Sequence, residues 1–195
     1  MDKIVIDIET KNTFADVGGY GNLTKLQMSF VGVYSYRQNE YLSFFENEFD
    51  KLGPVLQGAG LIVGFSTNRF DIPILNEYYP FNVKAIESLD ILDDIEEKLG
   101  HRVKLDTLAQ TNLKVGKTAH GLEAIKFYNE DRLEDLKNYC LQDVKLTKDL
   151  YELGMKQGYL LVPTNHGKEI TKVEFNWKHR LPTIGNIQPQ PLTLF

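Results

Sequence analysis

Two carboxylates stand two positions apart near the N-terminus, at the end of a short hydrophobic run that reads Ile-Val-Ile-Asp-Ile-Glu over residues 4–9. The β-branched residues of this run predict a strand. Alternate residues of a strand share a face, so Asp7 and Glu9 should project side by side. Like charges this close repel unless a cation lies between them, and carboxylate oxygens suit Mg²⁺ or Mn²⁺. Taken alone, the pair could also mark a strand end that reaches solvent.

A third acid, Asp71, follows a second hydrophobic run at residues 61–65, which predicts a buried strand. The segment 64–71 reads Gly-Phe-Ser-Thr-Asn-Arg-Phe-Asp and leads into a predicted helix at 72–78. Open α/β sheets bind their ligands at the carboxyl ends of strands, which is where this segment stands. The structural alternative is that Asp71 interacts only with the dipole of the helix it begins.

A fourth acid, Asp143, lies in the longest predicted helix, at about residues 133–155. Tyr139 precedes it by four positions, so the phenol and the carboxylate share one face of that helix. Such pairs also occur by chance, and packing alone would account for Tyr139. Neighbouring Cys140 is predicted to point elsewhere and to serve in packing.

The three motifs occur in the order D-x-E on the first strand, N-x-F-D at a strand-to-helix turn, and Y-x-x-x-D on a long helix. This order resembles the DEDD 3′→5′ exonucleases of ribonuclease H-like fold, in the subclass with tyrosine in its third motif. The proofreading domains of family-B DNA polymerases and stand-alone relatives belong to that subclass. The resemblance covers about residues 1–155 and includes all three motifs.

The resemblance implies a metal site and a mechanism. In that family two divalent cations, Mg²⁺ or Mn²⁺, flank the scissile phosphate during hydrolysis. By resemblance, Asp7 contacts both cations, Glu9 and Asp143 complete the first, and Asp71 supports the second. Tyr139 is expected to orient the attacking water. These five residues form the expected catalytic set.

The resemblance also implies a substrate. Thr10 is expected to contact the terminal 3′ nucleotide, and Asn68 and Phe70 are expected to line the substrate channel. The expected reaction is 3′→5′ exonucleolytic hydrolysis of single-stranded DNA or frayed 3′ ends to nucleoside 5′-monophosphates. An RNA exonuclease is the alternative within the enzyme class, because discrimination through the 2′-hydroxyl depends on pocket shape. A non-catalytic adaptor that binds nucleic acid or a clamp is the alternative from another class.

The hydrophobic pattern as a whole predicts an α/β fold, a ribonuclease H-like mixed sheet flanked by helices. Ser88 is expected to open one of those helices, and residues 159–162 and 172–177 predict a C-terminal hairpin. The predicted organisation is an exonuclease domain at 1–157, a hairpin at 158–177 packed on it, and a flexible tail at 178–195. Strands are expected at 3–8, 28–36, 40–45 and 61–65, and helices at 49–57, 72–78, 89–99, 105–110, 122–128 and 133–155.

The composition fits one globular domain of 195 residues, with 42% hydrophobic and 25% charged residues. The net charge of −5 argues against a nucleic-acid ligand, but two divalent cations held by the four acids would bring the balance close to neutral. A basic stretch of Arg102, Lys104, Lys114 and Lys117 either faces a nucleic-acid backbone or is simply solvated. A single cysteine, no apolar run of membrane-spanning length and no leader-like start predict a cytoplasmic protein.

The final residues 190–195, Gln-Pro-Leu-Thr-Leu-Phe, end the chain on apolar side chains, which invite association when exposed. They resemble the peptide with which bacterial proteins bind the replication sliding clamp, whose usual form is Gln-Leu-Ser/Asp-Leu-Phe. Leu192, Leu194 and Phe195 match its anchors, whereas Pro191 stands where its glutamine belongs. The alternative is a tail that packs on its own domain.

Overall fold

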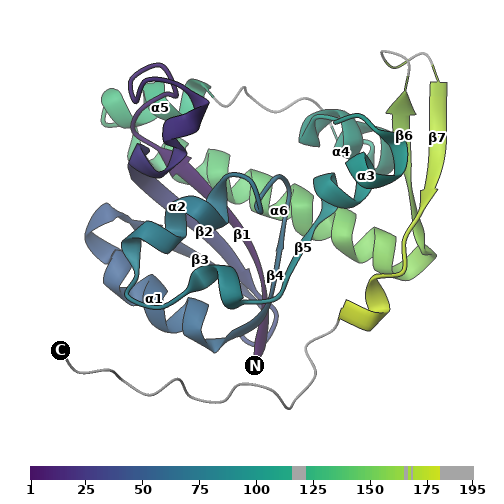
Figure 1. Cartoon of the computed structure of the whole chain (residues 1–195), viewed down its shortest axis with the longest axis horizontal. Coiled ribbons are helices and arrows are strands. Elements are labelled where there is room, and N and C mark those ends of the chain that lie inside the picture. The colour runs from purple at the N-terminus through teal and green to yellow at the C-terminus, as the bar shows by residue number, and fades with distance from the viewer. Residues whose placement is uncertain (116–121, 165–166, 168, 181–195) are drawn as a thin grey trace.

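A five-stranded mixed sheet forms the centre of the computed structural model, which describes residues 1–115, 122–164, 167 and 169–180 (Figure 1). The strands are β1 (Asp2–Thr10), β2 (Met28–Ser35), β3 (Glu40–Phe45), β4 (Ala59–Gly64) and β5 (Ser88–Asp90), in the order β3-β2-β1-β4-β5. Strands β1, β2 and β3 pair antiparallel, whereas β4 runs parallel to both β1 and β5. The predicted mixed α/β sheet is therefore confirmed.

Helices cover both faces of this sheet. Helix α6 crosses one face against β1 and β2, while α1 and α2 pack on the other (Figure 1). The α-helices are α1 (Phe49–Gly58), α2 (Asp71–Tyr78), α3 (Ile91–Leu99), α4 (Leu105–Leu113), α5 (Leu122–Asn129) and α6 (Leu133–Gln157). Short 3₁₀ turns lie at η1 (Tyr20–Lys25), η2 (Glu46–Glu48), η3 (Val83–Ala85) and η5 (Trp177–Arg180). Within the described residues, no helix is both long and apolar enough to cross a bilayer.

Alternation along β1 divides its side chains between two cores. Ile4 and Ile6 are buried in the core that includes residues of α1 and α2. Val5 is buried in the other core, together with residues of α6. Because side-chain directions alternate, Asp7 and Glu9 lie on the same face as Val5. The two carboxylates therefore point to the side of the sheet that α6 covers.

A glycine in β2 allows α6 to lie close to the sheet. Gly32 pairs with Asp7 across the β1–β2 ladder. A Cβ atom at Gly32 would lie 3.0 Å from Cys140 Sγ and 3.0 Å from Val144 Cγ2, which is tighter than ordinary van der Waals contact. The missing side chain thus lets the middle of α6 approach the strand backbone beside Asp7. This approach brings the segment of α6 that carries Asp143 to the end of β1.

The C-terminal hairpin, β6 (Tyr159–Thr164) and β7 (Glu169–Glu174), forms a separate two-stranded sheet that contacts α4 and α6 (Figure 1). The predicted second strand at 172–177 extends too far, because Trp177 begins η5 instead. Trp177 is buried, its ring occupies the space that a side chain at Gly154 would need, and its Nε1 donates to Asp94 Oδ2 at 2.6 Å. Packing against α6 therefore ends the strand.

The start of α3 also differs from the prediction. Residues 88–90 form β5 beside β4, so Ser88 does not open the helix. Asp90 takes that role, because its side chain accepts hydrogen bonds from the backbone N–H groups of Leu92 and Asp93. The proposed clamp-binding residues Leu192, Leu194 and Phe195 lie outside the described residues.

Candidate active site

Four carboxylates from three separate elements line one cleft of about 580 Å³. Asp7 and Glu9 come from the C-terminal end of β1, Asp71 is the first residue of α2, and Asp143 lies on α6. Tyr139, one helical turn before Asp143, lines the same cleft. The structure thus brings all five residues of the expected catalytic set to one place.

Asp71 is fixed to the strand that carries the first two acids. The backbone N–H of Ile8, which lies between Asp7 and Glu9, donates to Asp71 Oδ1 at 3.0 Å. Asp71 is only 3% exposed. Burial raises the pKa of its carboxyl to about 7, although backbone N–H donors act in the opposite direction. The hydrogen bond holds α2 against β1 while leaving Asp71 at the cleft.

The carboxylates are crowded enough to oppose their own ionisation. Burial raises the pKa of Asp7 well above its usual range, and the charges of Glu9, Asp71 and Asp143 raise it further. Burial also raises the pKa of Glu9 well above its usual range, followed by the charges of Asp143 and Asp71. Burial is likewise the largest cause that raises the pKa of Asp143 to about 7. A cation held between these oxygens would relieve both the burial and the repulsion.

Cys140 faces the carboxylates, which corrects the prediction that it points elsewhere. Its side chain is fully buried, in agreement with a packing role. Its Sγ also lies 3.3 Å from Asp7 Oδ2 and 3.4 Å from the Asp7 carbonyl oxygen. Ligand atoms of Asp7, Glu9 and Cys140 lie within 4.8 Å of one another. The pattern of α6 could not reveal this contact, because it depends on how closely the helix approaches β2.

Tyr139 keeps its proton at neutral pH. Burial raises the pKa of its phenol far above the usual value, and the charge of Asp143 is the next cause. Its ring meets the ring of Phe127 on α5 edge-on, with centroids 6.4 Å apart. The phenol is therefore a neutral hydroxyl held beside a carboxylate, and it can donate a hydrogen bond into the cleft.

An aromatic edge borders the cleft next to the carboxylates. Phe70 and Thr10, both predicted to contact substrate, line the cleft. Phe70 meets Phe14 edge-on at 6.0 Å between centroids, and Phe14 lies 4.2 Å from the ring of Tyr20. The Tyr20 residue is 81% exposed. The sequence prediction did not include Phe14 and Tyr20, which fall in a loop and a 3₁₀ turn that have no periodic pattern.

The sequence of residues 4–154 matches the family model of the RNase_H superfamily. The chain belongs to the RNase_H superfamily. The matched segment contains all four cleft carboxylates and Tyr139. Membership confirms the predicted ribonuclease H-like fold and supports nuclease activity in general, while the DEDD class and its tyrosine subclass stay predictions.

A solved structure with the same fold agrees with this membership. The family B DNA polymerase from the hyperthermophilic archaeon Pyrobaculum calidifontis aligns with a TM-score of 0.62 at 19% sequence identity. The alignment covers 80% of this RNase_H superfamily chain and 24% of the polymerase chain, so this chain spans about a quarter of the polymerase's length. At that identity the likeness concerns the fold alone. A comparison with curated proteins finds no match.

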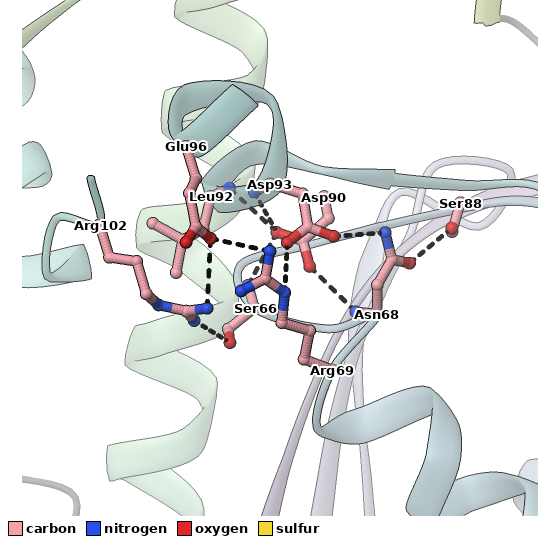
Figure 2. Close-up of polar contacts among 9 residues, drawn as sticks. All are labelled: Ser66, Asn68, Arg69, Ser88, Asp90, Leu92, Asp93, Glu96 and Arg102. Carbon is pink, nitrogen blue, oxygen red and sulfur yellow. Dashed lines mark hydrogen bonds and ion pairs between the residues drawn. The ribbon is translucent and has the colours of Figure 1, made fainter. Parts of the chain in front are cut away.

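Asn68, predicted to line the substrate channel, is not among the residues that line the cleft in this RNase_H superfamily domain. Its Nδ2 donates to Asp93 Oδ2 at 2.9 Å, and its Oδ1 accepts from Ser88 Oγ at 2.7 Å (Figure 2). Other residues of the β4–α2 loop (residues 65–70) line the cleft instead, among them Ser66 and Arg69. Asn68 therefore joins the loop to β5 and α3.

The β4–α2 loop owes its shape to Asp90, a residue that sequence reasoning missed. The buried Asp90 carboxylate accepts from the backbone N–H groups of Ser66 and Asn68, each at 2.9 Å, besides capping α3 (Figure 2). Ser66 adopts a left-handed conformation with φ of 69°, which costs energy for a residue with a side chain. Asp90 offsets that cost because its carboxylate accepts hydrogen bonds from two backbone N–H groups of the loop.

A fifth acid, Asp106, stands near the carboxylates and was also missed. It lies in the first turn of α4. Its charge helps to raise the pKa of Asp143, after burial, and contributes to the raised pKa of Tyr139. Its short local sequence, Leu-Asp-Thr, carries no signal beyond a helix start. The position of α4 against α6 is what brings it close.

Proposed function

We propose that this protein is a metal-dependent 3′→5′ exonuclease of the cytoplasm, which hydrolyses single-stranded DNA or frayed 3′ ends to nucleoside 5′-monophosphates. One observation carries the proposal: Asp7, Glu9, Asp71 and Asp143 meet in one cleft with Tyr139 one turn from Asp143. Membership of the RNase_H superfamily supports the proposal, because it favours nuclease activity in general.

The donor set fits two divalent cations such as Mg²⁺ or Mn²⁺. Hard carboxylate oxygens suit these ions, and bound cations would relieve the burial and the mutual repulsion that raise the pKa values of these acids. Asp7, Glu9 and Asp143 would hold one ion, and Asp7 and Asp71 the other. When bound, the ions would supply an activated water and neutralise charge on the scissile phosphate.

The remaining steps fall to side chains of the chain itself. The neutral Tyr139 hydroxyl would orient the attacking water for in-line displacement. Thr10 and Phe70 would position the terminal nucleotide, because both border the cleft beside the carboxylates. An enzyme that requires a free 3′-hydroxyl beside these residues would cleave at a true 3′ terminus and not at an internal phosphate. This requirement would account for the proposed polarity.

The test is digestion of 5′-labelled single-stranded DNA and RNA with Mg²⁺, with Mn²⁺ and with EDTA. The expected product is a ladder that shortens from the 3′ end, needs a divalent cation and slows when a 3′-phosphate blocks the terminus. Asp7→Ala should lower the rate by several orders of magnitude, since it removes the shared ligand. Digestion that persists in EDTA, or release of the 5′ label as the first product, would contradict the proposal.

The same experiment separates the alternatives. Faster digestion of RNA than of DNA would favour the RNA exonuclease. Tight binding of oligonucleotides without any cleavage would favour the non-catalytic adaptor. We also propose a partner for the C-terminal residues: Leu192, Leu194 and Phe195 dock into the hydrophobic groove of a bacterial sliding clamp, which would raise the local concentration of enzyme at DNA ends.

A further inference from the structure

Two arginines line the cleft together with the carboxylates. Arg69 lies in the β4–α2 loop, two residues before Asp71, and Arg102 lies between α3 and α4. Their side chains are 52% and 42% exposed, so both guanidinium groups can reach a ligand in the cleft. Among the described residues, Arg69 and Arg102 are the basic side chains that line it.

Carboxylates of α3 hold the two guanidinium groups in place. Arg69 Nε lies 3.1 Å from Asp93 Oδ1, and Arg69 Nη2 lies 2.8 Å from Glu96 Oε2. The same oxygen of Glu96 lies 3.4 Å from Arg102 Nη1 (Figure 2). Arg102 Nη2 also donates to Ser66 Oγ at 2.7 Å. Glu96 therefore links the two arginines into one group.

This group has a fixed position relative to the carboxylates. The β4–α2 loop is held at its base by Asp90, through the backbone N–H groups of Ser66 and Asn68. The loop leads directly into Asp71, which is bonded to β1 through the Ile8 N–H. A ligand on the arginines would thus lie at a set place beside the acids.

Each guanidinium keeps donors for a ligand. A guanidinium carries five N–H donors in a planar fork that matches the oxygens of a phosphate. In the described part of the chain, Arg69 Nη1 and Arg102 Nε have no partner, whereas the other nitrogens contact Asp93, Glu96 or Ser66. Stability alone explains the arrangement poorly, because exposed ion pairs contribute little to folding.

We propose that Arg69 and Arg102 bind the phosphodiester backbone of the substrate strand beside the scissile phosphate, and that Glu96 preorganises them. The inference rests on the proposed nuclease function. Two divalent cations would only balance the four acids, so positive groups are needed to attract a polyanion where the strand continues past the metal ligands. Arginine suits this role better than lysine because its fork engages two phosphate oxygens at once.

The test is the salt dependence of binding to a short fluorescein-labelled oligothymidine, measured by fluorescence anisotropy in Ca²⁺, with a gel to check that the strand stays intact. Arg69→Gln and Arg102→Gln should each weaken binding about tenfold at low salt. Each should also reduce the slope of log K against log salt by about 0.7, as expected for one lost phosphate contact on a single strand. Arg37→Gln is the matched control, because Arg37 is exposed in the β2–β3 turn, beside the start of β1 and away from the acids.

A second variant separates phosphate binding from support of the loop. Glu96→Gln keeps both arginines but removes the carboxylate that holds them, so the salt slope should stay at the wild-type value while affinity falls by less than in the arginine variants. If the arginines only brace the loop, all three variants should weaken binding equally and leave the salt slope at the wild-type value, which would overturn the inference. Arginine variants that match Arg37→Gln would also overturn it, while leaving the nuclease proposal intact. A wild-type protein that neither binds nor cleaves oligonucleotides would remove both.

Discussion

The thiol of Cys140 on α6 donates a hydrogen bond to Asp7 Oδ2 on β1 across 3.3 Å. Burial and the charge of Asp7 raise the pKa of that thiol well above its usual value, so it stays a protonated donor. The contact orients the carboxylate of Asp7, which we propose as a ligand of both metal ions. The thiol that makes it is buried in the protein core.

Replacing this donor should weaken metal binding. Cys140→Ala removes the hydrogen bond, and loss of a partner behind a metal ligand costs about tenfold in metal affinity. Cys140→Ser keeps a donor of similar size and should remain close to wild type. Calorimetric titration of each variant with Mn²⁺ measures the difference. Equal Mn²⁺ affinity in Cys140→Ala and wild type would show that the thiol only fills space.

Without metal, the folded protein should lose stability as the pH rises. The pKa of Asp71 and that of Asp143 are raised to about 7, and those of Asp7 and Glu9 are raised as well. An unfolded carboxyl has a pKa of about 4, so between about pH 4 and about pH 7 the folded state holds protons that the unfolded chain has released. Raising the pH through this window therefore favours unfolding.

Thermal melts in EDTA at about pH 5 and about pH 8 measure this effect, with a lower midpoint expected at the higher pH. Adding Mg²⁺ should raise the midpoint most at the higher pH, where the carboxylates are ionised. Asp143→Asn removes one of the titrating groups and should flatten the pH dependence. A metal-free midpoint that climbs from the lower to the higher pH would be incompatible with the crowded carboxylates.

Tyr139→Phe should slow turnover without disturbing the metal site. The substitution keeps the ring that packs against Phe127 but removes the hydroxyl that we assign to the attacking water. Positioned groups of this kind contribute roughly 10²–10⁴-fold to rate. Single-turnover cleavage measures the loss, and Mn²⁺ titration and the melting midpoint serve as controls. Unchanged turnover would mean that the hydroxyl takes no part.

Gly64→Ala should destabilise the protein and impair cleavage. A Cβ atom at Gly64 would lie 1.6 Å from Thr67 Oγ1, so the β4–α2 loop would have to move. Overpacking of this kind costs on the order of 2 kcal/mol. Gly21→Ala is the matched control, because a Cβ there meets no atom within 4 Å. Denaturant unfolding compares the two, and equal stability would show that the loop adjusts freely.

Deleting residues 190–195 should leave hydrolysis of short oligonucleotides unchanged and abolish binding to a sliding clamp. Prolines favour an extended backbone, so Pro189 and Pro191 should reduce the ordering cost of binding, and Leu192, Leu194 and Phe195 should supply the apolar anchors. The measurement is calorimetric titration of a peptide covering residues 186–195 against a bacterial clamp. Absence of binding at high micromolar peptide would exclude the partner.

The carboxylates could be predicted from the sequence because each motif is local. Two-residue spacing on a strand places Asp7 and Glu9 on one face, and four-residue spacing on a helix does the same for Tyr139 and Asp143. Hydrophobic periodicity likewise predicts the mixed sheet, since strands and helices differ in period. No single motif predicts that these residues meet; the resemblance of the ordered motifs to a known family implies it.

The features that could not be predicted from the sequence depend on contacts between distant segments. Asp90 shapes the loop at Ser66 from 24 positions away, and Arg102 reaches Ser66 from 36. Asn68 was predicted to face substrate from its place in the motif, but its side-chain amide forms hydrogen bonds with residues of a neighbouring strand and helix. Such partners follow from how elements pack, which local spacing does not encode.

The bond between Cys140 and Asp7 spans 133 positions of the chain, and this separation bears on how the protein becomes active. Contacts so distant in sequence slow folding, because a long loop must close before they form. Until α6 docks on β1 and β2, the emerging polypeptide has neither Tyr139 nor Asp143 at the cleft. A chain in which α6 has not docked on the sheet is therefore expected to lack hydrolytic capacity.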